Sequence, residues 1–125
     1  MPSPSRIFGD WGEQIAVDFL ISVGFEIKVR NYKTKQGEID LIVAGEGMII
    51  AVEVKTRSNH QFGYPEEAIT PKKLATIYGV FHTWLSENQL LDQPNRVDAI
   101  AITLTDPDPA QSIPPPPTIL HLKDL

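Results

Sequence analysis

The chain contains no cysteine. Disulfide bonds, thiolate metal sites and a cysteine nucleophile are therefore excluded. The absence of cysteine is also typical of proteins that work in the reducing cytoplasm. We expect a cytoplasmic location on that basis.

Long apolar segments are missing as well. The longest predominantly apolar run, residues 48–54, is far shorter than the roughly 20 residues of a membrane-spanning helix. Residues 1–5 lack the apolar stretch of a secretion signal. We therefore expect neither a membrane partner nor a signal peptide.

Two common catalytic motifs are also absent. No Gly-x-Ser-x-Gly sequence is present, so serine hydrolase chemistry has no support. The segment Gly9–Gly12 lacks the Lys-Ser/Thr pair of a phosphate-binding loop. The three histidines, His60, His82 and His121, have no metal-ligand spacing, and we expect core or surface positions for them.

The charge distribution is uneven. A net charge of −5 by itself disfavours nonspecific binding to nucleic acid. However, residues 28–73 carry a net charge of +2, whereas residues 1–27 carry −3 and residues 74–125 carry −4. The middle of the chain is therefore the part best suited to a polyanionic substrate.

The sequence predicts one compact α/β domain over residues 1–125, with a core at about 7–104. Apolar periodicity predicts helices over residues 7–23 and from about residue 70. Short apolar runs and turn signals predict the remaining elements: strands at 25–32, 37–45, 48–56 and 97–104, a proline-rich acidic loop at 106–117, and a short edge strand at 118–122.

Both helices are expected to be amphipathic. The core side of the first helix comprises Phe8, Gly12, Ile15, Ala16, Phe19 and Val23. Glu13 borders that side, an unusual position for a glutamate whose only role is solubility. In the second helix Thr70 is the expected N-cap, with Pro71 next to it. The apolar face of the second helix comprises Leu74, Ile77, Tyr78, Phe81 and Leu85.

The most informative feature is a pair of charged positions inside two apolar strands. Gly37–Ile42 contains Asp40, and Ala51–Lys55 contains Glu53. A turn at residues 45–48 would join the strands as a hairpin, and a two- or four-residue loop would place Asp40 directly opposite Glu53. A three-residue loop would instead shift the register and separate the two acids onto opposite faces.

Two facing carboxylates repel each other unless a positive group lies nearby. Carboxylate oxygens are the ligands that Mg²⁺ prefers, and Mn²⁺ is an alternative. We therefore expect Asp40 and Glu53 to bind a divalent cation, with Glu13 completing the cluster. Lys55 is expected to orient a water molecule and to stabilise negative charge on a phosphate. The alternative is a structural salt bridge between Glu38 and Lys55, with an incidental contact between the two acids.

Five further cations are candidates for contact with a nucleic-acid backbone. They are Lys33, Lys35, Arg57, Lys72 and Lys73. The two last lysines occupy the first turn of the second helix, where the helix dipole disfavours cations, so an anion bound there would explain them. Chance surface placement explains them equally well. Asp98 is either a support for the metal site or a local structural residue.

These motifs resemble the PD-(D/E)XK nuclease signature and, more specifically, the YraN-like family within that superfamily. The resemblance covers residues 8 to about 104. One departure is that Ile39 stands where the signature has its proline. The matching segments are Gly37–Ile42, Val52–Arg57, Gly12–Ala16, Gly24–Phe25, Asn31, Phe62–Gly63, Thr70–Lys73 and Arg96–Asp98.

The resemblance implies a restriction-endonuclease-like αβββαβ core, with a central mixed sheet flanked by helices. It also implies similarity to Holliday-junction resolvases. By that resemblance, Asp40 and Glu53 of this chain would bind metal and Lys55 would serve catalysis. Glu13 would be an accessory acid. We therefore expect a Mg²⁺-dependent endonuclease that cuts DNA in preference to RNA, with branched DNA as a candidate substrate and a homodimer as a candidate assembly. The alternative is an inactive nuclease-like module that binds nucleic acid or protein.

Overall fold

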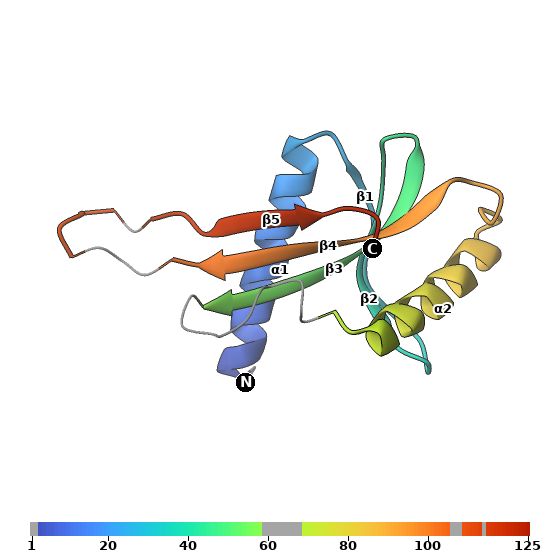
Figure 1. Cartoon of the computed structure of the whole chain (residues 1–125), viewed down its shortest axis with the longest axis horizontal. Helices are drawn as coiled ribbons and strands as arrows, with labels where there is room; N and C mark the ends of the chain where they lie inside the picture. Colours follow the sequence, from blue (N-terminus) through green and yellow to red (C-terminus); the bar gives the residue numbers. More distant parts are fainter. Residues whose placement is uncertain (1–2, 59–68, 106–108, 114) are drawn as a thin grey trace.

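The computed structural model describes residues 3–58, 69–105, 109–113 and 115–125. These residues form two helices and a five-stranded sheet (Figure 1). Along the chain the elements are α1 (Pro4–Ser22), β1 (Glu26–Lys33), β2 (Glu38–Gly45), β3 (Met48–Ser58), α2 (Pro71–Glu87), β4 (Asn95–Leu104) and β5 (Thr118–Leu122).

The sheet is mixed, and its strands follow the order β1-β2-β3-β4-β5. Strands β1, β2 and β3 pair antiparallel, β3 and β4 pair parallel, and β5 returns antiparallel to β4 at the edge. The parallel pair needs a crossover, and α2 supplies it. The predicted α/β class, the αβββαβ order and the edge strand are confirmed.

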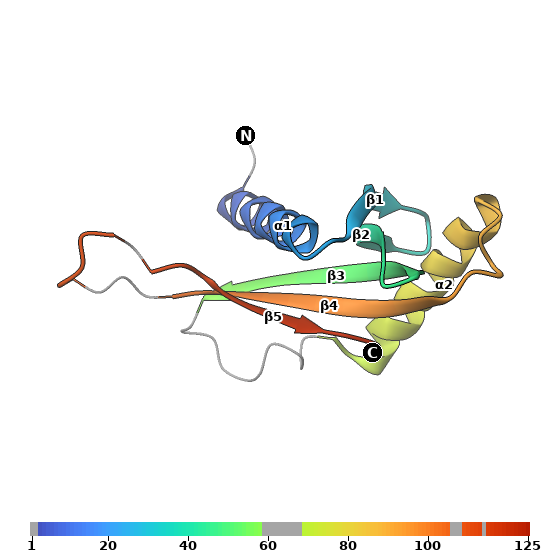
Figure 2. The ribbon, with the colours of Figure 1, turned by 90° about the horizontal axis from the view of Figure 1, so that it is seen from above.

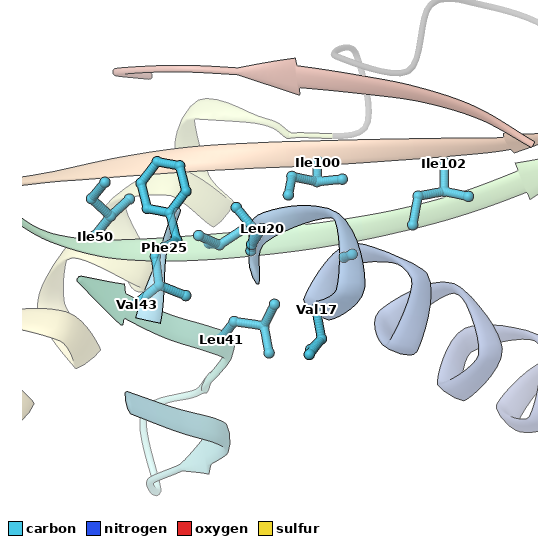
Figure 3. Close-up of a cluster of buried hydrophobic side chains, with 10 residues drawn as sticks. Val17, Leu20, Phe25, Leu41, Val43, Ile50, Ile100 and Ile102 are labelled. Atoms are coloured by element: carbon cyan, nitrogen blue, oxygen red, sulfur yellow. The ribbon is translucent and has the colours of Figure 1, made fainter. Parts of the chain in front are cut away.

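The two helices cover opposite faces of the sheet. In Figure 2, α1 runs along one side of the long strands β3 and β4. On β3, Ile50 and Val52 belong to the core beneath α1, whereas the intervening Ala51 belongs to the core beneath α2. Figure 3 shows the first of these cores, in which Leu20 of α1 lies among apolar side chains of the sheet. The sheet is thus buried on both faces, and this accounts for the continuous apolar runs of its central strands.

The start of α2 follows the predicted signal, whereas α1 begins at Pro4, three residues earlier than expected. Thr70 Oγ1 accepts a hydrogen bond from Lys73 N at 3.1 Å, and this contact confirms Thr70 as the N-cap of α2. Two predicted core positions were wrong. Val23 is exposed because α1 ends at Ser22, one residue earlier than expected. Tyr78 is also exposed, and its hydroxyl donates a hydrogen bond to Leu125 O at 3.0 Å.

Asp98 is completely buried in β4, where its register partner on β3 is Val52, the residue before Glu53. Its carboxylate accepts hydrogen bonds from Arg96 Nε at 2.8 Å and from Asp124 N at 2.9 Å. His121 Nε2 of β5 lies 2.9 Å from the same carboxylate. This network joins β4 to the C-terminal segment, so Asp98 has the structural role that was one of its two predicted roles.

Several sequence features lie outside the described residues. Phe62 and Gly63, which contributed to the family resemblance, belong to this group, as does His60. The proline-rich loop is described only in part, and its described residues form neither helix nor strand. Neither helix among the described residues has the combined length and apolarity needed to cross a membrane.

Helix α1 lies very close to β3 at Gly12. A Cβ atom built at Gly12 would collide with the side chain of Thr56, whereas one built at Gly9 on the same helix would meet nothing within 4 Å. The absence of a side chain at Gly12 therefore lets α1 lie against β3. This close approach determines where the next residue, Glu13, is placed relative to the sheet.

The mutation Gly12→Ala is expected to destabilise the protein by about 1–3 kcal/mol, because the added methyl group forces α1 and β3 apart. Gly9→Ala is the matched control and should stabilise the exposed helix by roughly 0.5–1 kcal/mol. Urea unfolding followed by circular dichroism measures both changes. Equal effects of the two substitutions would contradict the close approach at Gly12.

Candidate active site

The β2–β3 hairpin has the register that brings two acids together. Glu46 and Gly47 form its two-residue loop, and both have positive φ angles, 55° and 77°. From that loop the pairing runs in register to Leu41 opposite Val52. One further step in the same register would bring Asp40 opposite Glu53, although the pairing itself ends at Leu41 and Val52. The three-residue loop that would have separated the acids is not formed.

The pairing of β2 with β3 is recorded only as far as Leu41 and Val52, although both strands continue. Beyond that point Asp40 Oδ2 accepts a hydrogen bond from Val54 N at 2.8 Å. The carboxylate thus reaches the β3 backbone itself. Ile39 and Ile42 also pack in the same core, so the side-chain alternation of β2 is broken around Asp40. The acid lies where the two strands stop pairing.

The environment of Asp40 disfavours its charged form. Burial, and after it the charge of the neighbouring Glu53 carboxylate, raise the pKa of Asp40 to about 7. The hydrogen bond from Val54 N acts in the opposite direction but is the weaker influence. A hydrogen bond between the Asp40 and Glu53 side chains also raises the pKa of Asp40, because it favours the protonated form.

Glu53 forms an ion pair with a lysine of α2. Its side chain is buried, with a residue exposure of 8%, and Glu53 Oε1 lies 2.9 Å from Lys73 Nζ of α2. A buried carboxylate without a partner would cost several kcal/mol. Lys73 therefore acts as a counter-ion at the site, a contact that its place in the sequence did not reveal.

Glu13 approaches the pair from α1. It is buried, and Asn31 Nδ2 donates a hydrogen bond to Glu13 Oε1 at 3.1 Å, while Arg30 Nη2 lies 3.5 Å from the same oxygen. Burial and the charge of Asp40 raise the pKa of Glu13, and Arg30 and Asn31 lower it in part. Asn31 has a φ of 55°, a left-handed conformation that asparagine tolerates better than most residues. In this backbone conformation the side-chain amide of Asn31 reaches Glu13.

A cleft of about 790 Å³ opens beside these residues. Glu13, Asp40 and Lys55 all line its wall, and Lys55 is exposed to solvent there. Among the described residues the Lys55 ammonium forms no ion pair, so it is available to an anion in the cleft. Glu53 is not among the lining residues. It lies behind Asp40, on the side of Lys73.

Of the five cations predicted to contact a nucleic-acid backbone, Lys33 lines the cleft wall. Lys73 forms an ion pair with Glu53. Lys35, Arg57 and Lys72 are absent from the cleft wall.

Arg6 is a cleft cation that the sequence did not single out. It was missed because the first helix was predicted to begin at residue 7. The earlier start depends on Ser3, whose side chain accepts a hydrogen bond from Arg6 N at 3.2 Å. A Ser-Pro pair before an apolar run is a helix-start signal that could have identified it.

The salt bridge proposed as the structural alternative is not formed. Glu38 pairs with Lys33 of β1 at 4.0 Å, and no ion pair between Glu38 and Lys55 exists within the part of the chain that the structure describes. Over the same residues, no group of three or more acids or histidines is already arranged around one metal position. The described residues provide a repelling pair of acids, Asp40 and Glu53. Glu13 and the Lys55 ammonium, which forms no ion pair over those residues, line the cleft beside Asp40.

Comparison with known proteins gives a consistent assignment. The model of the uncharacterised protein family UPF0102 matches residues 12–102, which include all four residues of this cluster. A UPF0102 protein of Clostridioides difficile is 46% identical over 98 residues, covering 78% of this chain and 86% of the relative. A relative from Geotalea daltonii is 42% identical over 120 residues, covering 96% and 89%. A third, from Neisseria meningitidis, is 44% identical over 94 residues, covering 75% and 82%.

The raised pKa of Asp40 predicts a pH-dependent stability of the metal-free protein. The folded state keeps a proton on Asp40 between pH 3.8 and about 7, whereas the unfolded state has lost it. The free energy of unfolding should therefore fall as pH rises through this window. Asp40→Asn, which can still accept from Val54 N, should flatten that fall. Urea unfolding in EDTA between pH 4 and pH 8 measures it, with the exposed Asp18→Asn as control. An unchanged slope in Asp40→Asn would contradict the assignment.

Proposed function

We propose that this chain, which belongs to the UPF0102 family, is a Mg²⁺-dependent endonuclease that hydrolyses phosphodiester bonds of DNA. The observation that carries the proposal is the convergence of Asp40 and Glu53 beside a cleft lined by Glu13 and Lys55. The restriction-endonuclease-like core agrees with it. Membership of the PD-(D/E)XK superfamily is part of the same proposal.

The donor set fits a hard divalent cation. Three carboxylates supply only oxygen ligands, which Mg²⁺ prefers and Mn²⁺ accepts. Without a cation the site relies on a proton on Asp40 and on Lys73 beside Glu53. A dication held by Asp40 and Glu53, with Glu13 directly or through a water, would remove the repulsion that raises the pKa of Asp40. When bound, such an ion lowers the pKa of water and screens negative charge on the scissile phosphate.

The chain's own residues supply position and charge. The exposed Lys55 ammonium can donate to a phosphate oxygen as negative charge develops there. Arg6 and Lys33 on the same cleft wall can contact the flanking backbone. Arg30 and Asn31 fix the direction of Glu13. Catalysis by such a site depends on positioning and electrostatics rather than on a covalent intermediate.

The nature of the substrate rests on the resemblance to Holliday-junction resolvases. That resemblance favours DNA over RNA, and branched DNA over a plain duplex. A homodimer belongs to the same proposal, because cutting two strands symmetrically needs two sites.

A second candidate is an inactive nuclease-like module that binds nucleic acid or protein. The observation that favours it is the Lys73–Glu53 ion pair, which occupies one of the two central carboxylates with a protein cation. The two candidates differ in what metal ions do to the protein. An active site should bind a dication through Asp40, whereas an inactive module need not.

Metal binding is expected to stabilise the protein. Addition of Mn²⁺ at about 100 times its dissociation constant should raise the free energy of unfolding by roughly 2.7 kcal/mol. Asp40→Asn should reduce this gain sharply, because it removes a charged ligand, while Asp18→Asn should leave it intact. Thermal unfolding with and without Mn²⁺ provides the measurement. A gain that is equal in all three proteins would place the metal elsewhere.

Cleavage is expected to require both the acids and the lysine. A fluorescently labelled four-way DNA junction should be cut in Mg²⁺ or Mn²⁺, and Asp40→Ala should abolish the cut. Lys55→Met should lower the rate by about 10²–10³-fold, the usual cost of a lost transition-state donor. Lys28→Met, an exposed lysine of β1 outside the cleft wall, is the control and should cut normally.

Binding without cleavage would support the second candidate. In that case the protein would bind the DNA junction in a salt-dependent manner without cutting it. Asp40→Ala and Lys55→Met would leave that binding unchanged. Equal cleavage by wild type and Asp40→Ala would indicate a contaminating nuclease and would contradict the proposed function.

A further inference from the structure

Lys73 pairs with one of the two central acids, a contact that the sequence did not predict. Its Nζ lies 2.9 Å from Glu53 Oε1, and Glu53 in turn is near enough to Asp40 to share a hydrogen bond. The ammonium therefore lies at the edge of the acid pair. It carries out there part of what a metal ion would do, since it neutralises one carboxylate.

The position of Lys73 in α2 is electrostatically unfavourable by itself. The first turn of a helix repels cations, and Thr70 fixes that turn by accepting a hydrogen bond from Lys73 N. No acidic residue lies in this turn to compensate. The contact with a buried carboxylate offsets the repulsion. Lys73 thus makes two fixed contacts: its backbone N–H donates to Thr70, and its ammonium group pairs with Glu53 of β3.

The neighbouring Lys72 has none of these ties. It is exposed, and its ammonium forms no ion pair over the described residues. The two lysines share the same helix turn, so the dipole and the net charge affect them almost equally. Their side chains differ in one ion pair, the contact of Lys73 with Glu53. Lys72 is therefore a control for every general electrostatic effect of a charge at this helix end.

We propose that Lys73 is an exchangeable counter-ion: it binds Glu53 in the metal-free protein and gives up that carboxylate when a divalent cation binds. This inference rests on the proposed metal site. Lys73 and the metal ion both need Glu53 oxygens, so each should weaken the binding of the other. By linkage, the factor is the same in both directions. Lys73 can consequently reach a phosphate only after the metal has taken Glu53.

The test measures Mn²⁺ affinity by isothermal titration, using wild type, Lys73→Met, Lys73→Arg and Lys72→Met. Removing the competitor should tighten Mn²⁺ binding about fivefold or more in Lys73→Met. Lys73→Arg keeps the charge and should stay near wild type, as should Lys72→Met. A purely structural role for Lys73 would leave affinity unchanged or weaken it.

Metal-free stability provides the reciprocal measurement. In EDTA, Lys73→Met should unfold at a lower temperature than Lys72→Met, because Glu53 is left buried without its partner. Saturating Mn²⁺ should shrink that difference, since the metal then neutralises Glu53. If Lys73→Met does not fold, Lys73→Gln, which keeps a hydrogen-bond donor without the charge, replaces it in both experiments.

The outcomes separate this inference from the proposed function. Wild type that binds Mn²⁺ through Asp40, with no tightening in Lys73→Met, would overturn the exchange and leave the metal site intact. No Mn²⁺ binding in wild type or in any variant would overturn both. Binding that is weak in wild type and measurable only in Lys73→Met would support the exchange in its strongest form.

Discussion

The repulsion between the carboxylates of Asp40 and Glu53 is the constraint to which the rest of the structure responds. Each acid sits in a strand whose neighbouring side chains are core residues, so neither can be fully hydrated. The protein limits the cost in three ways. The β2–β3 pairing stops just before the acids, a backbone amide of β3 binds one carboxylate, and Lys73 neutralises the other. Such arrangements destabilise a fold and are typical of functional sites.

The two helices bring further charged side chains to the acid pair from opposite faces of the sheet. Helix α1 approaches β3 through Gly12 and so brings Glu13 to the cleft, where β1 side chains orient it. Helix α2 begins at a capped turn that places Lys73 against Glu53 from the other side. The acid pair is thus reached from both faces of one sheet. Lys55 and Asp40 line the cleft on the open side of this arrangement.

Much of the fold was readable from the sequence because its signals are local. The hairpin register follows from a two-residue turn, and the start of α2 follows from Thr70 and Pro71. That register predicts the approach of Asp40 to Glu53, although the strand pairing itself ends at Leu41 and Val52. Contacts between distant elements were not readable. The pairing of Lys73 with Glu53 depends on how α2 docks, and Val23 was misplaced because a one-residue change in helix length turns a side chain to solvent.

The central claim is that the acid pair exists to bind a dication, and a crystal grown or soaked with Mn²⁺ tests it most directly. Anomalous scattering should reveal one ion between the Asp40 and Glu53 carboxylates, at oxygen distances of about 2.0–2.3 Å. Lys73 should no longer contact Glu53 in that structure. At saturating Mn²⁺, an acid pair with no ion beside it and with Lys73 still in contact with Glu53 would contradict the account.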